Sequence, residues 1–312
     1  MPIIVKFILF QLLILIPFSA GIIVKKYFAD PAATSKKIIM VNLMVLEPPV
    51  ILWTIWGLTI SPELAFLPAA GLLMVLAGLF AGNILAPLLG LEGAGRKTFI
   101  ISSSLANHGF TMGGFICYIF LKETGLGLSS IFISYFVPYT FLVIFSYARA
   151  GAGSRYRAGL RDFLASYQNM PLYAALAALA LLLSGVRRPA LDPPLEPLIM
   201  ASVALYYWTL GLTVNMKEIL PLRGEHAALA AVRFLVIPGL ACLLLLVVPM
   251  GGDIKTVIRI QSFMPAAIYS VVTSVLFDLD PRRASSLFVV NTLLFILIVV
   301  PAMVLLRQAG VW

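Results

Sequence analysis

The stretch ANHGFTMGG at residues 106–114 interrupts one apolar segment of the chain, and FMPAA at residues 263–267 interrupts another. The two interruptions take matching places in the two halves of the chain, because each follows a Lys-Thr pair, Lys97-Thr98 or Lys255-Thr256. Paired breaks in corresponding apolar helices are typical of the binding sites of transporters. A helix that ends deep in a bilayer leaves main-chain N–H and C=O groups without helical partners, so these groups must face protein or a water-filled cavity.

The composition indicates a multi-pass membrane protein. Of the 312 residues, 61% are hydrophobic and 11% are charged, and the mean hydropathy is +1.03. Soluble domains have about 25% charged residues. The net charge of +9 would favour nucleic acid as the partner of a soluble protein, but here the basic residues lie mostly between apolar runs. We therefore expect the lipid bilayer as a partner, and no nucleic acid.

The apolar segments predict an all-α protein with ten membrane spans of about 20 residues, a length that crosses about 30 Å of hydrocarbon. The spans lie near residues 4–24, 38–60, 64–90, 97–121, 127–148, 170–187, 195–216, 226–249, 253–277 and 284–307. The polar connection at residues 151–169 separates a first five-helix repeat, residues 1–150, from a second, residues 170–312. Because five is odd, the repeats must be inverted, and the broken fourth and ninth helices are expected to cross near the middle of the membrane.

Weak internal similarity supports the two repeats. Ser104 and Asn107 of the fourth span correspond to Ser262 and Pro265 of the ninth, at the same offset as the two Lys-Thr pairs. Chance resemblance between apolar sequences is the alternative, but matched spacing at several positions favours a repeat.

The distribution of Lys and Arg predicts the orientation. These residues are concentrated in the connections that follow the first, third, fifth, seventh and ninth spans. Cytoplasmic connections contain the excess of Lys and Arg in membrane proteins. We therefore expect a multi-pass protein of the cytoplasmic (inner) membrane, with both termini on the non-cytoplasmic side.

Four short motifs resemble the auxin efflux carrier family of permeases, in the bile/arsenite/riboflavin-type transporter superfamily. The motifs are NLMVLEPP at residues 42–49 (second helix), NHGF at 107–110 (fourth helix), LGLT at 210–213 (seventh helix) and MPAA at 264–267 (ninth helix). They follow the family's order over nearly the whole chain. One departure is that Gly113-Gly114 stands where family members often have a proline.

This resemblance implies a fold and a function. Helices 1, 2, 6 and 7 would form a scaffold, and helices 3–5 and 8–10 a transport unit that moves against it, in a homodimer. Substrates in the family are small organic anions, dicarboxylates in bacteria and indole acetate in plants. We therefore expect a secondary transporter and not an enzyme, with no bound cofactor and with H⁺ or Na⁺ as the candidate coupling ion.

The breaks themselves suit an anion. A half-helix N-terminus has a partial positive charge and free N–H groups, and we expect such ends near Gly109 and Ala266. Asn107 offers a donor and an acceptor without a buried charge, and Pro265 lacks an N–H and should free the carbonyl four residues earlier. The alternatives are that Asn107 only caps a helix end and that Pro265 only kinks a helix.

Glu47 is the most unusual titratable residue, because it falls near the middle of the second span. A charged side chain at that depth costs about 2.5–3.5 kcal/mol on insertion scales and is functional by default. We expect Glu47 to be a proton-coupling or gating acid that faces the cavity. The alternative is a neutral or paired Glu that fixes helix packing beside Pro48-Pro49.

Four further polar residues are candidates for the site. Arg233 and Arg259, inside the eighth and ninth spans, either pair with a substrate carboxylate or with Glu47, or snorkel to the nearer surface. Gln261 either contributes to the substrate or Na⁺ site or forms interhelical hydrogen bonds. His108 either responds to pH or has a cavity-lining or packing role.

Other patterns exclude rival functions. The sequence has no Gly-Lys-Ser/Thr phosphate loop, no His/Cys cluster of metal-binding spacing and no evident nucleophile, so we expect no metal site and no catalytic residues. Asn291 is expected to be a helix-packing group. The alternative function is a sodium-coupled carrier that resembles bile-acid symporters. It would need oxygen-rich Na⁺ sites beside the breaks, where this chain has few carboxylates.

Overall fold

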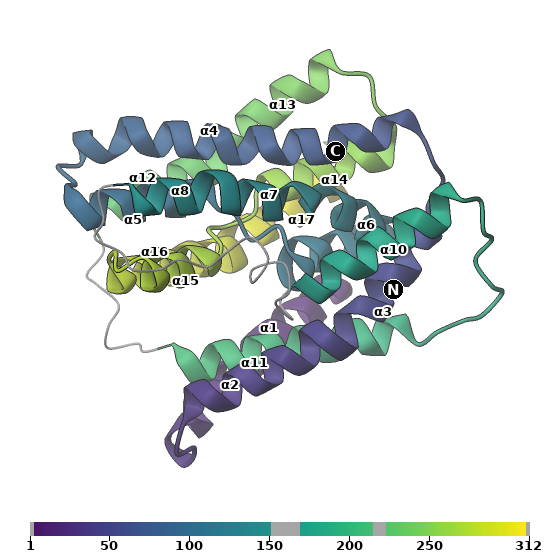
Figure 1. Cartoon of the computed structure of the whole chain (residues 1–312), viewed down its shortest axis with the longest axis horizontal. Helices are drawn as coiled ribbons and strands as arrows, with labels where there is room; N and C mark the ends of the chain where they lie inside the picture. The colour runs from purple at the N-terminus through teal and green to yellow at the C-terminus, as the bar shows by residue number, and fades with distance from the viewer. Residues whose placement is uncertain (1–2, 151–168, 215–222, 310–312) are drawn as a thin grey trace. The chain divides into compact units, whose positions relative to one another are not determined.

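The computed structural model describes residues 3–150, 169–214 and 223–309 (Figure 1). Within these ranges the chain is built of helices, and its β-type pairing is limited to a bridge between Ala106 and Ala266. The predicted all-α class is therefore confirmed for the described residues. Nearly all of the predicted connection at residues 151–169 lies outside them.

Six helices of the described ranges are long and apolar enough to cross a membrane: Pro31–Trp56, Pro62–Leu88, Phe110–Arg149, Leu195–Thr213, Gly224–Val247 and Pro281–Gln308. The helices before the two breaks, α5 (Gly93–Ser104) and α14 (Gly252–Ser262), have only 12 and 11 residues. Each is about 17 Å long, which is short of the roughly 30 Å hydrocarbon layer. The breaks thus account for part of the difference from ten, and the ten-span count and the inverted repeat stay predictions.

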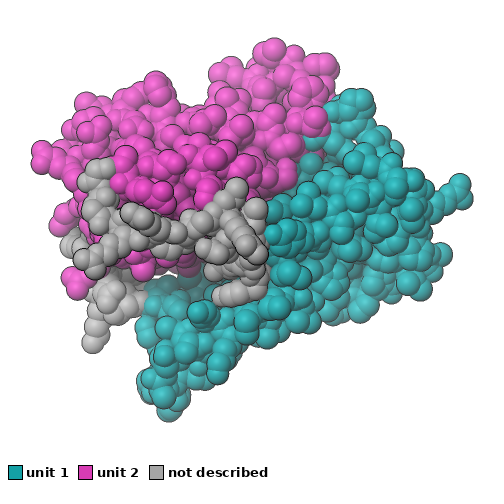
Figure 2. Space-filling view, viewed as in Figure 1, with its two compact units in different colours: residues 1–64, 109–131, 159–215 teal, residues 65–108, 132–158, 216–312 magenta. Residues whose placement is uncertain are grey.

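The chain forms two compact units, which Figure 2 shows in different colours. Unit 1 comprises residues 1–64, 109–131 and 159–215, and unit 2 comprises residues 65–108, 132–158 and 216–312. Each unit takes segments from both halves of the chain. The units therefore differ from the two predicted repeats, whose boundaries stay a prediction.

In unit 1, helix α1 (Ile3–Val24) packs closely along α11 (Leu195–Thr213). A Cβ added at Gly211 would stand 2.1 Å from the Phe18 carbonyl oxygen, and one at Gly21 would stand 2.3 Å from the Trp208 carbonyl oxygen. Small residues that let two backbones approach are a common means of helix association in membranes. The LGLT motif at residues 210–213 therefore has a packing role.

The second long helix of unit 1 runs through α2 (Pro31–Val41), the π-helical turn η2 (Asn42–Leu46) and α3 (Glu47–Trp56). It packs against α10 (Met170–Leu183) through a buried cluster of Ile51, Ile55, Ala174, Ala175 and Ala178. The side chain of Asn42 donates a hydrogen bond of 2.9 Å to the Ser202 carbonyl oxygen of α11. This helix is therefore fixed to both α10 and α11.

Helix α6 (Phe115–Phe132), which follows the π-helical turn η4 (Phe110–Gly114), turns back at Lys122. Lys122 has φ 56° and ψ −141°, and a Cβ added at Gly125 would stand 2.2 Å from the Cys117 carbonyl oxygen. In a straight helix, two residues at this separation would be about 12 Å apart. The turn falls in the predicted connection between the fourth and fifth spans, so the helix Phe110–Arg149 is not one straight rod.

Unit 2 is built around α4 (Phe66–Leu88), which packs against α5. The backbones approach closely, because a Cβ added at Gly78 would stand 2.2 Å from the Ser103 carbonyl oxygen. The remaining elements are η5 (Ile133–Tyr135), α7 (Phe136–Tyr139), η6 (Thr140–Ile144), α8 (Phe145–Arg149), α12 (Gly224–Ala231), η9 (Val232–Val236), α13 (Ile237–Val247), α14, α15 (Tyr269–Leu276), α16 (Pro281–Leu294), η10 (Phe295–Val299) and α17 (Val300–Gln308). A buried cluster joins α4, α5, α12 and α16 to the second break through Ala86, Phe99, Ile100, Leu229, Ala266 and Leu287.

Three π-helical turns precede a proline at the same distance. The turns η2, η9 and η10 end two residues before Pro48, Pro238 and Pro301. A proline has no N–H to donate and its ring clashes with the carbonyl four residues earlier, so the helix just upstream widens to i→i+5 bonding. Such turns often occur at functional sites. Two of them hold or adjoin a buried charged side chain, Arg233 and Glu47.

Candidate functional site

The first break follows α5 in unit 2. The helix ends at Ser104, and Leu105 is extended, with φ −77° and ψ 123°. Ala106, Asn107 and His108 continue without helical structure. The next residue, Gly109, is also extended and is grouped with unit 1, where η4 begins at Phe110. The interruption thus falls where the sequence predicts it.

The second break follows α14 in the same unit. The helix ends at Ser262, and the chain turns through Phe263 and Met264 before Pro265. The carbonyl of Gln261, four residues before the proline, accepts a hydrogen bond of 3.2 Å from the Met264 N–H. The expectation that Pro265 frees this carbonyl is therefore wrong, because the turn supplies another donor.

The two breaks lie side by side as an antiparallel pair. The Asn107 N–H donates to the Pro265 carbonyl oxygen at 2.8 Å, and the Ala267 N–H donates to the Leu105 carbonyl oxygen at 2.9 Å. These bonds flank the bridge between Ala106 and Ala266. Segments far apart in the sequence are thereby joined through their main chains inside unit 2.

Ala266 does not begin a helix, contrary to the expectation. Helix α15 begins at Tyr269, and the Ala266 N–H donates a hydrogen bond of 2.8 Å to the Asn291 side-chain oxygen on α16. The Ala266 amide is therefore occupied. In the first turn of α15, the Ser270 N–H bonds to the Ala267 carbonyl oxygen, and the N–H groups of Val271 and Val272 bond to the Ile268 carbonyl oxygen.

Asn291 thus has a more specific role than general helix packing. It is 1% exposed, and its side-chain nitrogen Nδ2 has no hydrogen-bond partner among the described residues. A polar residue in the apolar run of the tenth predicted span must find a buried partner. That requirement was the available signal, but the sequence did not identify Ala266 as the partner.

Arg233 connects both breaks from η9. Its side chain is fully buried, so it does not snorkel. Nε and Nη2 donate to the Met264 carbonyl oxygen at 3.0 and 2.8 Å, and Nη1 donates to the Ser103 carbonyl oxygen at 3.5 Å. No carboxylate of the described residues forms an ion pair with it.

The partners of Arg233 explain how its charge is tolerated. Ser103 lies in the last turn of α5, and Met264 lies just past the end of α14. The C-terminus of a helix has a partial charge of roughly −0.5, so two such ends offset about one positive charge. Arg233 therefore balances two helix ends that would otherwise repel an anion.

His108 and Gln261 connect the breaks through side chains. The Gln261 side-chain nitrogen Nε2 donates to the His108 carbonyl oxygen at 3.3 Å. The His108 ring is fully buried, its Nδ1 lies 2.5 Å from the Tyr135 hydroxyl, and it makes an edge contact with the Phe132 ring at 5.0 Å. Its Nε2 has no hydrogen-bond partner among the described residues.

Asn107 is 8% exposed, and no hydrogen bond of its side chain with another described residue is present. It does not cap α5 or η4 through its side chain. The backbone N–H of Asn107 is bonded to Pro265, and the side-chain amide is available to a ligand.

The two remaining candidates, Arg259 and Glu47, make no hydrogen bond to either break through their side chains among the described residues. Arg259 is half-buried on α14, one turn before the break, and forms no ion pair with a described carboxylate. Glu47 begins α3 in unit 1, is 5% exposed, and its N–H bonds to the Asn42 carbonyl oxygen of the π-helical turn. The structure thus brings together Asn107, His108, Gln261, Pro265, Ala266 and Arg233 in unit 2, and it places Glu47 in the other unit.

Residues 160–303 match the model of a family described as "Membrane transport protein". The matched range includes Arg233, α14 and the second break. This match confirms the family resemblance, and it covers two of the four motifs, those at residues 210–213 and 264–267. No curated protein matches the chain.

Proposed function

We propose that this chain is a secondary transporter of small organic anions, because residues 160–303 match the model of the membrane transport protein family. The substrates would be mono- or dicarboxylates or auxin-like weak acids, moved across the cytoplasmic membrane by alternating access. Both termini would lie on the non-cytoplasmic side, and the working form would be a homodimer.

The observation that carries the proposal is the bridge between the two breaks, with Arg233 on the adjoining helix ends. An anion at the breaks would lie near the N-terminal end of α15, where the partial charge of the helix dipole is positive. The opposing C-terminal charges of α5 and α14 are offset by the guanidinium. The balance of charge at this place therefore favours a negatively charged solute.

Three unbonded side-chain groups supply the remaining contacts in the proposal. These are the Asn107 amide, the His108 Nε2 and the Asn291 Nδ2, all on residues that are at least nine-tenths buried. A buried polar group without a partner costs about 1–3 kcal/mol, and a bound carboxylate would remove that cost. Gln261, Pro265 and Ala266 would frame the substrate through van der Waals contact, because the Pro265 carbonyl and the Ala266 N–H are already hydrogen-bonded. Arg259 would be a second charge partner.

Coupling is assigned to Glu47 in this proposal. It is a buried carboxyl beside a π-helical turn, without a hydrogen bond or ion pair of its side chain to a described residue. Proton coupling or gating is the role that such a group supports. The alternative is sodium coupling, in which Na⁺ and not H⁺ drives transport.

A thermal-unfolding screen of the purified protein tests the proposal. A ligand that binds the folded state at one hundred times its Kd stabilises it by about 2.7 kcal/mol. We expect carboxylates to raise the unfolding temperature of the native protein and of Asn83→Ala, but not of Asn107→Ala. Asn83 is the matched control, because its half-buried amide bonds to Leu79 within α4, away from the breaks.

The same screen, repeated with and without Na⁺ and across pH, separates the two coupling ions. A carboxylate effect that needs Na⁺ favours the sodium-coupled alternative. If no mono- or dicarboxylate stabilises the protein, and none is accumulated by proteoliposomes that contain it, the anion assignment is wrong.

A further inference from the structure

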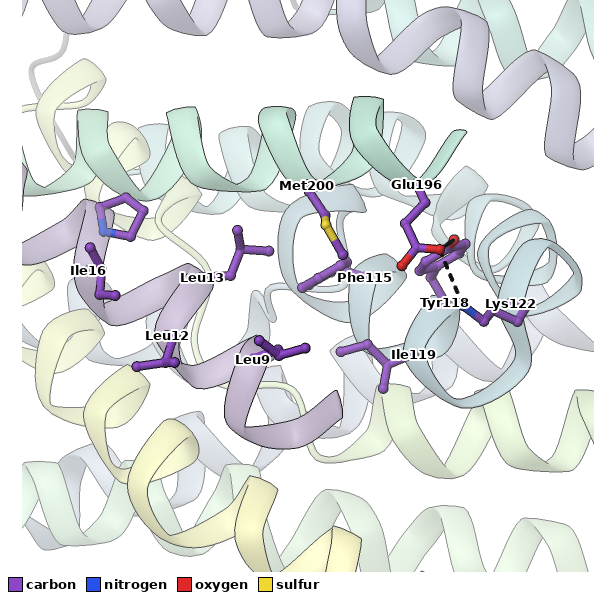
Figure 3. Close-up of a pocket in the computed structure, with 11 residues that line it drawn as sticks. Leu9, Leu12, Leu13, Ile16, Phe115, Tyr118, Ile119, Lys122, Glu196 and Met200 are labelled. Atoms are coloured by element: carbon purple, nitrogen blue, oxygen red, sulfur yellow. Dashed lines mark hydrogen bonds and ion pairs between the residues drawn. The ribbon is translucent and has the colours of Figure 1, made fainter. Parts of the chain in front are cut away.

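Unit 1 contains a groove of about 700 Å³ between α1, α6 and α11 (Figure 3). This volume is within the usual range of about 300–1,000 Å³ for ligand sites. Most of its wall is apolar and comes from Leu9, Leu12, Ile16, Phe115, Ile119 and Met200. Leu9, Leu12 and Ile16 are 45%, 45% and 59% exposed, so the groove is open along α1.

All of the charge of the groove lies at one end. Figure 3 shows Glu196, Tyr118 and Lys122 together there, with the leucine side chains of α1 extending away from them. The Lys122 ammonium is 3.6 Å from Glu196 Oε2 and 5.0 Å from the centre of the Tyr118 ring. The Tyr118 hydroxyl donates to the same carboxylate at 3.5 Å. The groove therefore has one cation and one anion at the end of an apolar channel.

The ion pair is loose enough to be exchanged. The Lys122 and Glu196 side chains are 55% and 53% exposed, and exposed ion pairs of this kind contribute little to stability. A ligand with one positive and one negative group would replace the Lys122–Glu196 pair by two ion pairs, one with each side chain. The protein loses little when the pair opens.

The backbone of Lys122 is strained. Its φ of 56° with ψ −141° is a conformation that glycine adopts readily and a side-chain residue does not. Strain of this kind is concentrated at ligand sites. The chain turns back at Lys122, so the turn places the ammonium at the polar end of the groove.

We propose that this groove binds one phospholipid with a primary-ammonium headgroup, of the phosphatidylethanolamine class. Its phosphate would bond to Lys122, its ammonium to Glu196, and one acyl chain would lie along Leu9, Leu12 and Ile16. The wall residues of α1 are apolar and exposed, and α11 beside them is long and apolar enough to cross a membrane, so we expect these side chains to contact bilayer lipid. The pairing of both charges favours a zwitterion with N–H donors over an anionic headgroup. The site is independent of the transport proposal, because it uses none of the residues of the breaks.

Native mass spectrometry of the full chain tests this inference. The protein is extracted from vesicles with equal amounts of phosphatidylethanolamine, phosphatidylglycerol and phosphatidylcholine. We expect phosphatidylethanolamine to be retained preferentially by the native protein. We expect Lys122→Gln and Glu196→Gln each to retain phosphatidylethanolamine about tenfold more weakly, because each variant loses one charge-assisted hydrogen bond to the headgroup.

Three variants make the test specific. Glu123→Gln is the matched control, because it breaks a similarly exposed ion pair, that with Arg188 at 3.0 Å, outside the groove, and it should retain the lipid. Met200→Trp should displace the acyl chain and reduce retention while both charges remain. Lys122→Gly relieves the strained backbone, so it should fold at least as well as the native protein and still lose the lipid preference.

Two results would overturn the inference. Equal retention of the three lipids by the native protein would mean that they are only the surrounding bilayer. A dimer mass that Met200→Trp abolishes, without a change in lipid retention, would mean that a second copy of the chain occupies the groove.

Discussion

Arg233 donates two hydrogen bonds to one oxygen atom, the carbonyl oxygen of Met264, from Nε at 3.0 Å and from Nη2 at 2.8 Å. The bonded carbonyl lies just past the end of α14, in the turn that precedes Pro265. A planar guanidinium is suited to such a paired contact, and an ammonium is not. This contact, with the longer one to Ser103, fixes a side chain of η9 to both breaks.

Replacement of Arg233 by Met is expected to destabilise the protein by more than about 3 kcal/mol, because each hydrogen bond to a charged group contributes about 1.5–3 kcal/mol. Arg233→Lys should be less damaging, since it keeps the charge and loses the paired geometry. Thermal unfolding measures both effects. Stabilisation by carboxylates should survive in Arg233→Lys and disappear in Arg233→Met, and full stabilisation of the Met variant would refute the charge-balance argument.

Asn107→Ala should separate ligand binding from folding. The Asn107 side chain makes no hydrogen bond with a described residue, whereas its N–H holds the bridge to Pro265. The alanine variant should therefore unfold within about 1 kcal/mol of the native protein. Asn107→Pro removes the N–H and should be destabilised by more than that. Equal stability of the two variants, measured by thermal unfolding, would mean that the bridge contributes little.

Tyr135→Phe should leave the His108 Nδ1 without its partner at 2.5 Å. An unpaired buried polar atom costs about 1–3 kcal/mol, and the thermal-unfolding temperature should fall accordingly. Tyr147→Phe is the control, because the Tyr147 hydroxyl makes only a long contact of 3.4 Å, with Asn83, in a partly buried position. A loss of the same size in both variants would show that the His108 contact has no special weight.

Gly211→Ala should weaken unit 1, whereas Gly239→Ala in another apolar helix should not. The new Cβ would stand 2.1 Å from the Phe18 carbonyl oxygen, so α1 would have to move away from α11. Overpacking of this kind costs typically about 1–3 kcal/mol. Gly239→Ala in α13 meets no atom within 4 Å and should be neutral or stabilising by up to about 1 kcal/mol. Thermal unfolding of both variants measures the difference.

The sequence predicted the places of the two breaks well, because Asn107-His108-Gly109 and Pro265 are local signals that end a helix. It misplaced the restart of the second helix by three residues. That error has a long-range cause, since the Asn291 side chain binds the Ala266 N–H and delays the helix until Tyr269.

The role of Arg233 illustrates what local patterns leave open. Its position in an apolar span indicated either a buried charge or a snorkelling side chain. The choice depends on which face of the helix points inward, and that is decided by the contact of η9 with α5 and the second break. The partners turned out to be carbonyl oxygens, and a sequence does not show where the ends of two helices converge. The groove in unit 1 was not predicted for a similar reason. It depends on the turn at Lys122, and a lysine in the sequence does not indicate a positive φ.

The join between residues 106 and 266 is made by amide and carbonyl groups that every amino acid other than proline possesses. Its two main-chain hydrogen bonds therefore do not depend on the side chains of residues 105, 106, 266 and 267. Substitutions of side chains near the breaks could therefore change which solute binds while these two main-chain hydrogen bonds stay the same.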